Sequence, residues 1–223
     1  MSEIVHWIKT GERGARAEFT DSDLITALIL IYQNPMGRYK LQNELNLSDS
    51  STKSLLNYCK KKDLLEASSG RSGHSLAPKG EELIQEIVRI LPKHDIYEFE
   101  VFPDKYHYYT IISNKKTEKS TDKKNTITSW KLRDIVVSYG GEAILFLFIN
   151  DQKQLVFPEE DIDLKNYYPD LQTYFENKAK KFLDPLNQIL IVSASSFEVA
   201  RKSAIISGLN YDKEIIASIH RKI

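Results

Sequence analysis

Short polar side chains that can hydrogen-bond to nucleic-acid bases gather between residues 50 and 57 of this 223-residue sequence. Hydroxyl and amide groups can reach base edges in the major groove of DNA, and lysine can bind guanine or a phosphate. We expect these side chains to face outward from a recognition helix over about residues 49–62. The candidates for base contact are Ser50, Ser51, Lys53, Ser54 and Asn57.

Basic side chains flank this stretch. Residues 36–62 hold six bases and two acids, a local charge of +4, although the whole chain has 31 basic and 31 acidic residues. Such a patch suits the phosphates of double-stranded DNA, and a solvated surface is the alternative interpretation. The candidates Arg38, Tyr39 and Lys40 begin the preceding helix, and Lys61 lies near the end of the recognition helix. Arg71 lies in a wing over about residues 68–73, where it can contact the phosphate backbone or the minor groove of DNA.

Helices and a hairpin must position these residues. Asp21 or Ser22 is suited to cap a first helix, Asn34–Pro35 ends it, and Ser48 is suited to cap the helix over 49–62. Cys59 falls on the apolar side of that helix, which indicates a small core residue rather than a redox sensor. Two short strands and an amphipathic helix over 78–91 follow. This order is typical of a winged helix-turn-helix.

The resemblance to a known family rests on several stretches. "ELNLSDSSTKSLLNYCKKKDLL" and "SLAPKG" resemble the helix-turn-helix core and the strand-to-helix junction of prokaryotic regulators. "KLRDIVVSYGGEAILFLFINDQKQLVFPEE" and "ILIVSASSFEVARKSAIISGL" resemble the domain of unknown function that follows the winged helix in an archaeal family of transcriptional regulators. The resemblance implies a left-handed backbone at Asp63, where the family has glycine, and it implies no base preference, because Lys53 stands where the family has arginine.

Strands and helices alternate in the second half. Apolar or aromatic stretches predict strands over residues 96–102, 106–113, 143–149 and 188–192, with the third of these central in the sheet. Helices are predicted over 129–139 and 170–183 and after residue 196. The predicted fold class is α+β, with an N-terminal winged helix-turn-helix over 1–92 and a small α/β sandwich domain over 93–223. We expect the second domain to make a homodimer or to sense an effector.

One interpretation of the serines that follow the predicted strand 188–192 is a binding site for an anion or a small-molecule effector, because a helix N-terminus presents free N–H groups. Simple capping of the helix by Ser195 or Ser196 is the favoured alternative. The effector candidates are Ser193, Ser195 and Ser196. The scattered histidines and the acidic stretch over 158–163 predict no metal site, and no cofactor or catalytic residue is nominated.

Composition sets the remaining expectations. One cysteine excludes an internal disulfide, no signal peptide is apparent, and the longest apolar run, residues 143–149, is too short to span a bilayer. We therefore expect a cytoplasmic, non-membrane transcriptional regulator that binds double-stranded DNA in a sequence-specific way and is not an enzyme. The alternatives are an enzyme with a fused winged helix acting on a small phosphorylated molecule, and a protein-interaction module using Tyr106–Tyr109.

Overall fold

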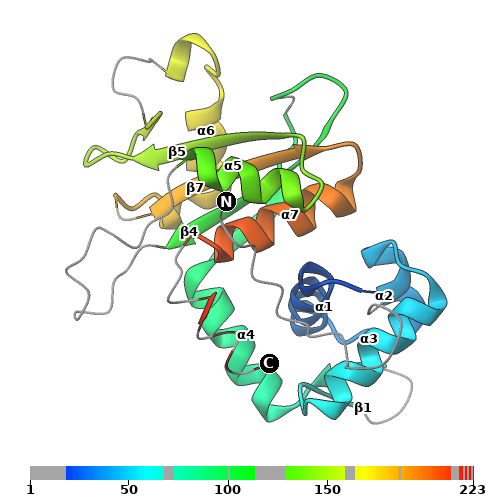
Figure 1. The fold of residues 1–223 in the computed structure, drawn as a ribbon. Helices are drawn as coiled ribbons and strands as arrows, with labels where there is room; N and C mark the ends of the chain where they lie inside the picture. Colours follow the sequence, from blue (N-terminus) through cyan, green and yellow to red (C-terminus); the bar gives the residue numbers. More distant parts are fainter. Residues whose placement is uncertain are drawn as a thin grey trace. The chain divides into compact units, whose positions relative to one another are not determined.

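Four helices and a two-stranded hairpin make up the first part of the chain in the computed structural model (Figure 1). The structure describes residues 19–67, 73–99, 101–113, 129–158, 164–185, 187–211, 216, 217, 219, 221 and 223. The first elements follow one another in the order expected from the sequence. They are α1 (Asp21–Gln33), α2 (Arg38–Leu45), α3 (Asp49–Lys61), β1 (Leu65–Ala67), β2 (His74–Leu76) and α4 (Pro78–Ile90).

The chain divides into two compact units, and each is described here by itself. Unit 1 consists of Met1–Glu86 with Ala217–Ile223, and unit 2 of Ile87–Ile216. The division falls inside α4, whereas the sequence analysis placed the domain boundary after residue 92.

The first helix is capped by Thr20 rather than by Asp21 or Ser22, so that prediction was wrong. The backbone N–H of Asp23 donates to Thr20 Oγ1 at 3.3 Å, and the backbone N–H of Thr20 donates to Asp23 Oδ2 at 2.8 Å. This reciprocal pair is a capping box, which places Asp21 and Ser22 inside the first turn, where both are buried. The predicted cap of α3 is confirmed, because Ser48 Oγ accepts from the backbone N–H of Ser51 at 3.0 Å.

Left-handed backbone conformations make the tight connections of unit 1. Asn46 ends α2 with φ of 50°, and Asp63 follows α3 with φ of 58°, which confirms the conformation expected at Asp63. At the base of the hairpin Gly73 has φ of +91°, and a Cβ there would lie 2.4 Å from the backbone of Met36 and Gly37. The backbone N–H of His74 donates to the Met36 carbonyl at 3.0 Å, which ties the hairpin to the connection between α1 and α2.

Unit 2 is built on an antiparallel five-stranded sheet with the strand order β3-β4-β7-β5-β6. With its helices this sheet makes the fold mixed α/β, where the sequence predicted α+β with a small α/β domain in this half. Its strands are β3 (Lys93–Ile96), β4 (Tyr106–Ser113), β5 (Ala143–Ile149), β6 (Leu155–Val156) and β7 (Asn187–Ala194). Its helices are α5 (Ser129–Ser138), α6 (Leu171–Ala179) and α7 (Phe197–Leu209), with short 3₁₀ turns at Leu164–Asn166 and Lys180–Phe182.

One strand prediction in this unit was wrong. The strand expected over 96–102 ends at Ile96, because Tyr97 turns into the core and packs its ring edge-on against Tyr174 of α6, with centroids 4.7 Å apart. The central position predicted for residues 143–149 is confirmed, because β5 lies inside the sheet between β7 and β6. This strand is apolar along its length because helices cover both sides of the sheet.

Helices lie on both faces of the sheet, α5 and α7 on one face and α6 on the other (Figure 1). Alternate residues of β4 follow this division: Tyr109 and Ile111 join the core beneath α6, whereas Thr110 and Ile112 meet α7. A Cβ at Gly208 would lie 2.9 Å from Leu91 Cδ2 and 3.0 Å from Thr110 Cγ2. The lack of a side chain at Gly208 therefore lets α7 pack closely against β4.

Candidate nucleic-acid interface

The helix α3 has one buried face and one polar exposed face. Its buried residues recur at helical spacing and fill the core of unit 1; they are Ser51, Thr52, Leu55, Leu56 and Cys59. Burial raises the pKa of the Cys59 thiol to about 12, which agrees with a core role rather than a reactive one. The exposed residues are Asp49, Ser50, Lys53, Ser54, Asn57, Lys60 and Lys61. Four of the five predicted base-reading residues therefore share one accessible face.

Ser51 is the exception, and its prediction as an outward-facing residue was wrong. Its side chain is only 8% exposed, and its hydroxyl lies 2.7 Å from Ser48 Oγ. The cap at Ser48 fixes Ser51 on the third helical position, where its side chain and backbone N–H both point back to the cap. Ser50 also contacts Ser48 Oγ, at 2.9 Å, but stays exposed.

Arg38 joins the start of α2 to the start of α3. Its Nε lies 3.2 Å from Asp49 Oδ1, its Nη2 donates to the Tyr39 hydroxyl at 3.1 Å, and its guanidinium carbon lies 4.9 Å from the centre of the Tyr39 ring. The ion pair offsets the charge of the Asp49 carboxylate at the N-terminus of α3. The sequence analysis missed this positioning role of Arg38. Tyr39 is 71% exposed, and Lys40 is exposed beside it.

Lysines gather at the other end of α3. Lys61 is exposed as predicted, and Lys60 is exposed on the same face as Lys53 and Asn57. The sequence analysis did not nominate Lys60, although its helical spacing from residues 53 and 57 was the signal that could have found it. Burial, together with the positive charge of Lys60, lowers the pKa of His74 on β2.

The predicted wing is described only at its base. Arg71 and residues 68–72 lie outside the described part of the chain. The register of the hairpin pairs Leu65 with Leu76 and Ala67 with His74.

The three predicted effector residues do not converge on one anion site. Ser193 is buried in β7, where its hydroxyl lies 2.7 Å from His107 Nδ1. Ser196 caps α7 by accepting from the backbone N–H of Val199 at 3.3 Å, which confirms the capping interpretation. Ser195 holds the carboxylate of Glu142: a hydrogen bond from Lys105 lowers the pKa of Glu142, and hydrogen bonds from the side chain and backbone of Ser195 lower it further. The carboxylate of Glu142 therefore already supplies a negative group beside the start of α7.

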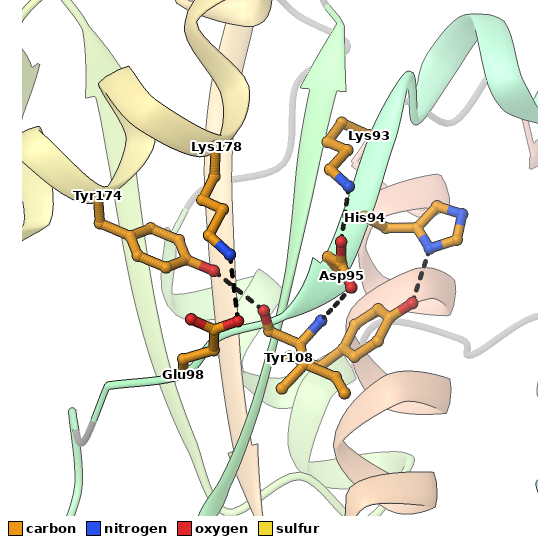
Figure 2. A network of polar contacts seen from close by, with 8 residues as sticks. Lys93, His94, Asp95, Glu98, Tyr108, Tyr174 and Lys178 are labelled. Atoms are coloured by element: carbon orange, nitrogen blue, oxygen red, sulfur yellow. Dashed lines mark hydrogen bonds and ion pairs between the residues drawn. The ribbon is translucent and has the colours of Figure 1, made fainter.

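Polar contacts lie along the edge strand β3 of unit 2 and join it to β4 and α6 (Figure 2). Lys93 pairs with Asp95 at 2.6 Å, His94 Nδ1 lies 2.7 Å from the Tyr108 hydroxyl, and the Tyr174 hydroxyl donates to the Ile96 carbonyl at 3.1 Å. Burial, the largest cause, lowers the pKa of His94 to about 4. Within the described residues no cluster of histidine, cysteine or carboxylate groups could hold a metal ion.

Comparison with known proteins finds one family model that matches part of unit 2. Residues 104–211 match the family model "Domain of unknown function (DUF4443)". A hypothetical protein from Pyrococcus horikoshii OT3, PH0730, has a similar solved structure, with a TM-score of 0.70, 22% sequence identity, and coverage of 92% of this chain and 100% of that chain. This likeness shows a shared fold. No curated protein matches the chain, and no described helix is long and apolar enough to cross a membrane.

Proposed function

We propose that this protein is a sequence-specific DNA-binding transcriptional regulator, with unit 1 as a winged helix-turn-helix and α3 as its recognition helix. The observation that carries the proposal is the division of α3 into a core face and an exposed face made only of polar side chains. Ser50, Ser54 and Asn57 on that face can hydrogen-bond to base edges, and Lys53 can reach guanine or a phosphate. The order of elements in unit 1 supports the same assignment.

The charge around α3 favours a polyanionic partner. The helices α2 and α3 carry five basic and two acidic side chains, which gives a formal charge of +3 on a chain that is neutral as a whole. Asp49 is paired to Arg38, so it opposes phosphate less than an unpaired carboxylate does. The side chains counted are Arg38, Lys40, Lys53, Lys60 and Lys61, against Glu44 and Asp49.

Each side chain has a role in this proposal. Helix α3 has 13 residues and is therefore about 20 Å long, enough to lie along the major groove. Lys53 and Asn57 then read bases, Tyr39 and Lys40 hold the phosphate backbone beside the start of α2, and Lys60 and Lys61 hold it beside the end of α3. Arg38 acts on Asp49 and so positions the start of α3. Arg71 on the wing stays a proposed contact to the backbone or minor groove.

Unit 2 is proposed to make a homodimer, to sense an effector, or both. A single recognition helix contacts few base pairs, and two copies related by a two-fold axis double the number of bases read. The proposal therefore includes a palindromic operator with half-sites about one helical turn of DNA apart.

Selection of fragmented genomic DNA by the purified protein at two salt concentrations, followed by sequencing, tests the proposal. We expect a palindromic motif that is still enriched at the higher salt, because base contacts lose less affinity to salt than phosphate contacts do. Binding that disappears at the higher salt and enriches no motif would contradict sequence-specific regulation and indicate a general nucleic-acid binder. Absence of binding at either salt would overturn the proposal.

A further inference from the structure

An open pocket lies at the end of the sheet in unit 2, around the connection between β3 and β4. Its volume is about 580 Å³, within the range of small-molecule sites. Two of its aromatic side chains remain well exposed, Tyr106 at 56% and Phe99 at 48%. Nine residues line it: Ile96, Tyr97, Glu98, Phe99, Asp104, Lys105, Tyr106, His107 and Phe197.

Packing behind the pocket holds its aromatic walls in place. Tyr97 and Phe99 both pack against Tyr174 of α6, with ring centroids 4.7 and 5.4 Å apart. On the other side Phe197 packs against Tyr108 at 5.7 Å, and the guanidinium carbon of Arg201 lies 5.0 Å from the centre of its ring. These walls are formed before any ligand arrives, which reduces the entropic cost of binding a flat molecule between them.

His107 lines the pocket and is hydrogen-bonded through both ring nitrogens. Its Nε2 accepts from the backbone N–H of Val101 at 3.2 Å, so the proton of the neutral ring lies on Nδ1, which donates to Ser193 Oγ at 2.7 Å. The first bond fixes the β3–β4 connection, and the second fixes the imidazole on β7. Both ring nitrogens are used in holding the pocket together.

The charges around the pocket disfavour an anionic ligand. The lining holds two carboxylates, Glu98 and Asp104, and one ammonium, Lys105. Glu98 pairs with Lys178 at 3.2 Å (Figure 2), and Lys105 pairs with Glu142. The lining itself therefore carries a formal charge of −1, which disfavours a phosphate or carboxylate and favours a cation.

We propose that this pocket is a small-molecule site for a flat aromatic compound that is neutral or carries a positive charge. The ring stacks among Tyr106, Phe99 and Phe197, and an amine on the ligand points to the carboxylates of Glu98 and Asp104. The site is independent of the proposed DNA binding, because every residue that forms it belongs to unit 2. The serines before α7 were candidates for binding an anion, whereas this pocket is proposed to bind a neutral or cationic compound.

Three probes with one indole ring and different charges test the proposal: tryptamine, indole and indole-3-acetate, titrated without DNA into the ¹⁵N-labelled full chain. We expect shifts of backbone amides in residues 96–99, 104–107 and 197, with affinities in the order tryptamine, indole, indole-3-acetate. Indole-3-acetate binding as tightly as tryptamine would overturn the charge assignment. Absence of shifts at these amides with all three probes at about 10 mM, where even millimolar affinities are visible, would overturn the site.

Two variants and a control locate the binding. Tyr106→Ala removes an exposed wall and should raise the dissociation constant of tryptamine by about 3- to 10-fold. Glu98→Gln should reduce the preference for tryptamine over indole by about 2- to 5-fold. Tyr167→Ala removes another exposed tyrosine of unit 2 that does not line the pocket, and it should leave all three affinities unchanged. Equal effects of Tyr106→Ala and Tyr167→Ala would contradict the assignment.

Discussion

His94 lies on the edge strand β3, where its ring stacks on Tyr108 with centroids 6.0 Å apart and its Nδ1 lies 2.7 Å from the Tyr108 hydroxyl. Burial lowers its pKa from 6.5 to about 4; repulsion by Lys93 and Arg201 acts in the same direction, and Asp95 opposes it. The unfolded chain therefore takes up a proton on His94 as the pH falls through 6.5, whereas the folded protein stays neutral there until about pH 4. As the pH falls from 6.5 to about 4, the free energy of unfolding therefore decreases. The contribution of the neutral His94 to stability is lost completely below about pH 4.

The size of the effect follows from the two pKa values. A separation from 6.5 to about 4, at about 1.36 kcal/mol for each pH unit, gives a loss of about 3 kcal/mol. His94→Asn keeps a hydrogen-bonding atom near the position of Nδ1 but cannot titrate in this range. Its free energy of unfolding should thus fall about 3 kcal/mol less than that of the unsubstituted protein between pH 7.5 and pH 4.

Urea unfolding at a series of pH values measures this difference. The sequence has two tryptophans, so Trp7→Phe in both proteins leaves Trp130 on α5 as the reporter for unit 2. NMR titration of the His94 ring protons in the folded chain gives the pKa directly. Parallel stability curves for the two proteins, or a titration midpoint near 6.5, would refute the reasoning.

Three further predictions concern unit 1. The buried Cys59 thiol, with its pKa raised to about 12, should not react with Ellman's reagent at pH 8 until urea is added, and rapid labelling of the folded protein would contradict this. At Asp63, with φ of 58°, glycine should leave the thermal unfolding temperature unchanged or raise it, whereas Asp63→Val should cost about 1–2 kcal/mol. Gly80→Ala should destabilise the protein by about 2 kcal/mol, because the new Cβ would lie 2.1 Å from the Leu64 carbonyl oxygen; a denaturation midpoint equal to the unsubstituted one would show that α4 can shift without cost.

Local signals in the sequence predicted the arrangement of α3 well. The apolar residues at 52, 55, 56 and 59 recur on one side of a helix, and Ser48 precedes them as a cap, so both the helix and its exposed face follow from spacing alone. Ser51 was misplaced because a side chain in the first turn can fold back on the cap residue, and helical periodicity does not include that hydrogen bond. Asp21 and Ser22 were taken as caps for a related reason: any of three consecutive polar residues fits the pattern, and the capping box selects Thr20.

Contacts between distant segments explain the failures in unit 2. Residues 96–102 alternate as a strand does, but Tyr97 leaves the sheet because α6, more than 70 residues later, offers it an aromatic pocket. The proposed ligand site was not predictable either, since its walls meet only where β4 pairs with β7, with Tyr106 opposite Ala194. For the serines of the β7–α7 connection the sequence favoured capping but left an anion site open, because it does not reveal that Glu142 reaches them from just before β5.

The claim that α3 reads DNA bases is tested most directly by an α3 variant, through the ratio of its affinity for the selected operator to its affinity for random DNA. Affinities for the selected operator and for random DNA of the same length would be measured for the unsubstituted protein and for the double variant Lys53→Ala, Asn57→Ala. Lys180→Ala, which removes one exposed cation from unit 2, serves as the charge control. If α3 reads bases, the double variant lowers the ratio of specific to random affinity by about 10- to 100-fold, and the control leaves it unchanged. Equal losses on both DNAs would contradict base reading by α3.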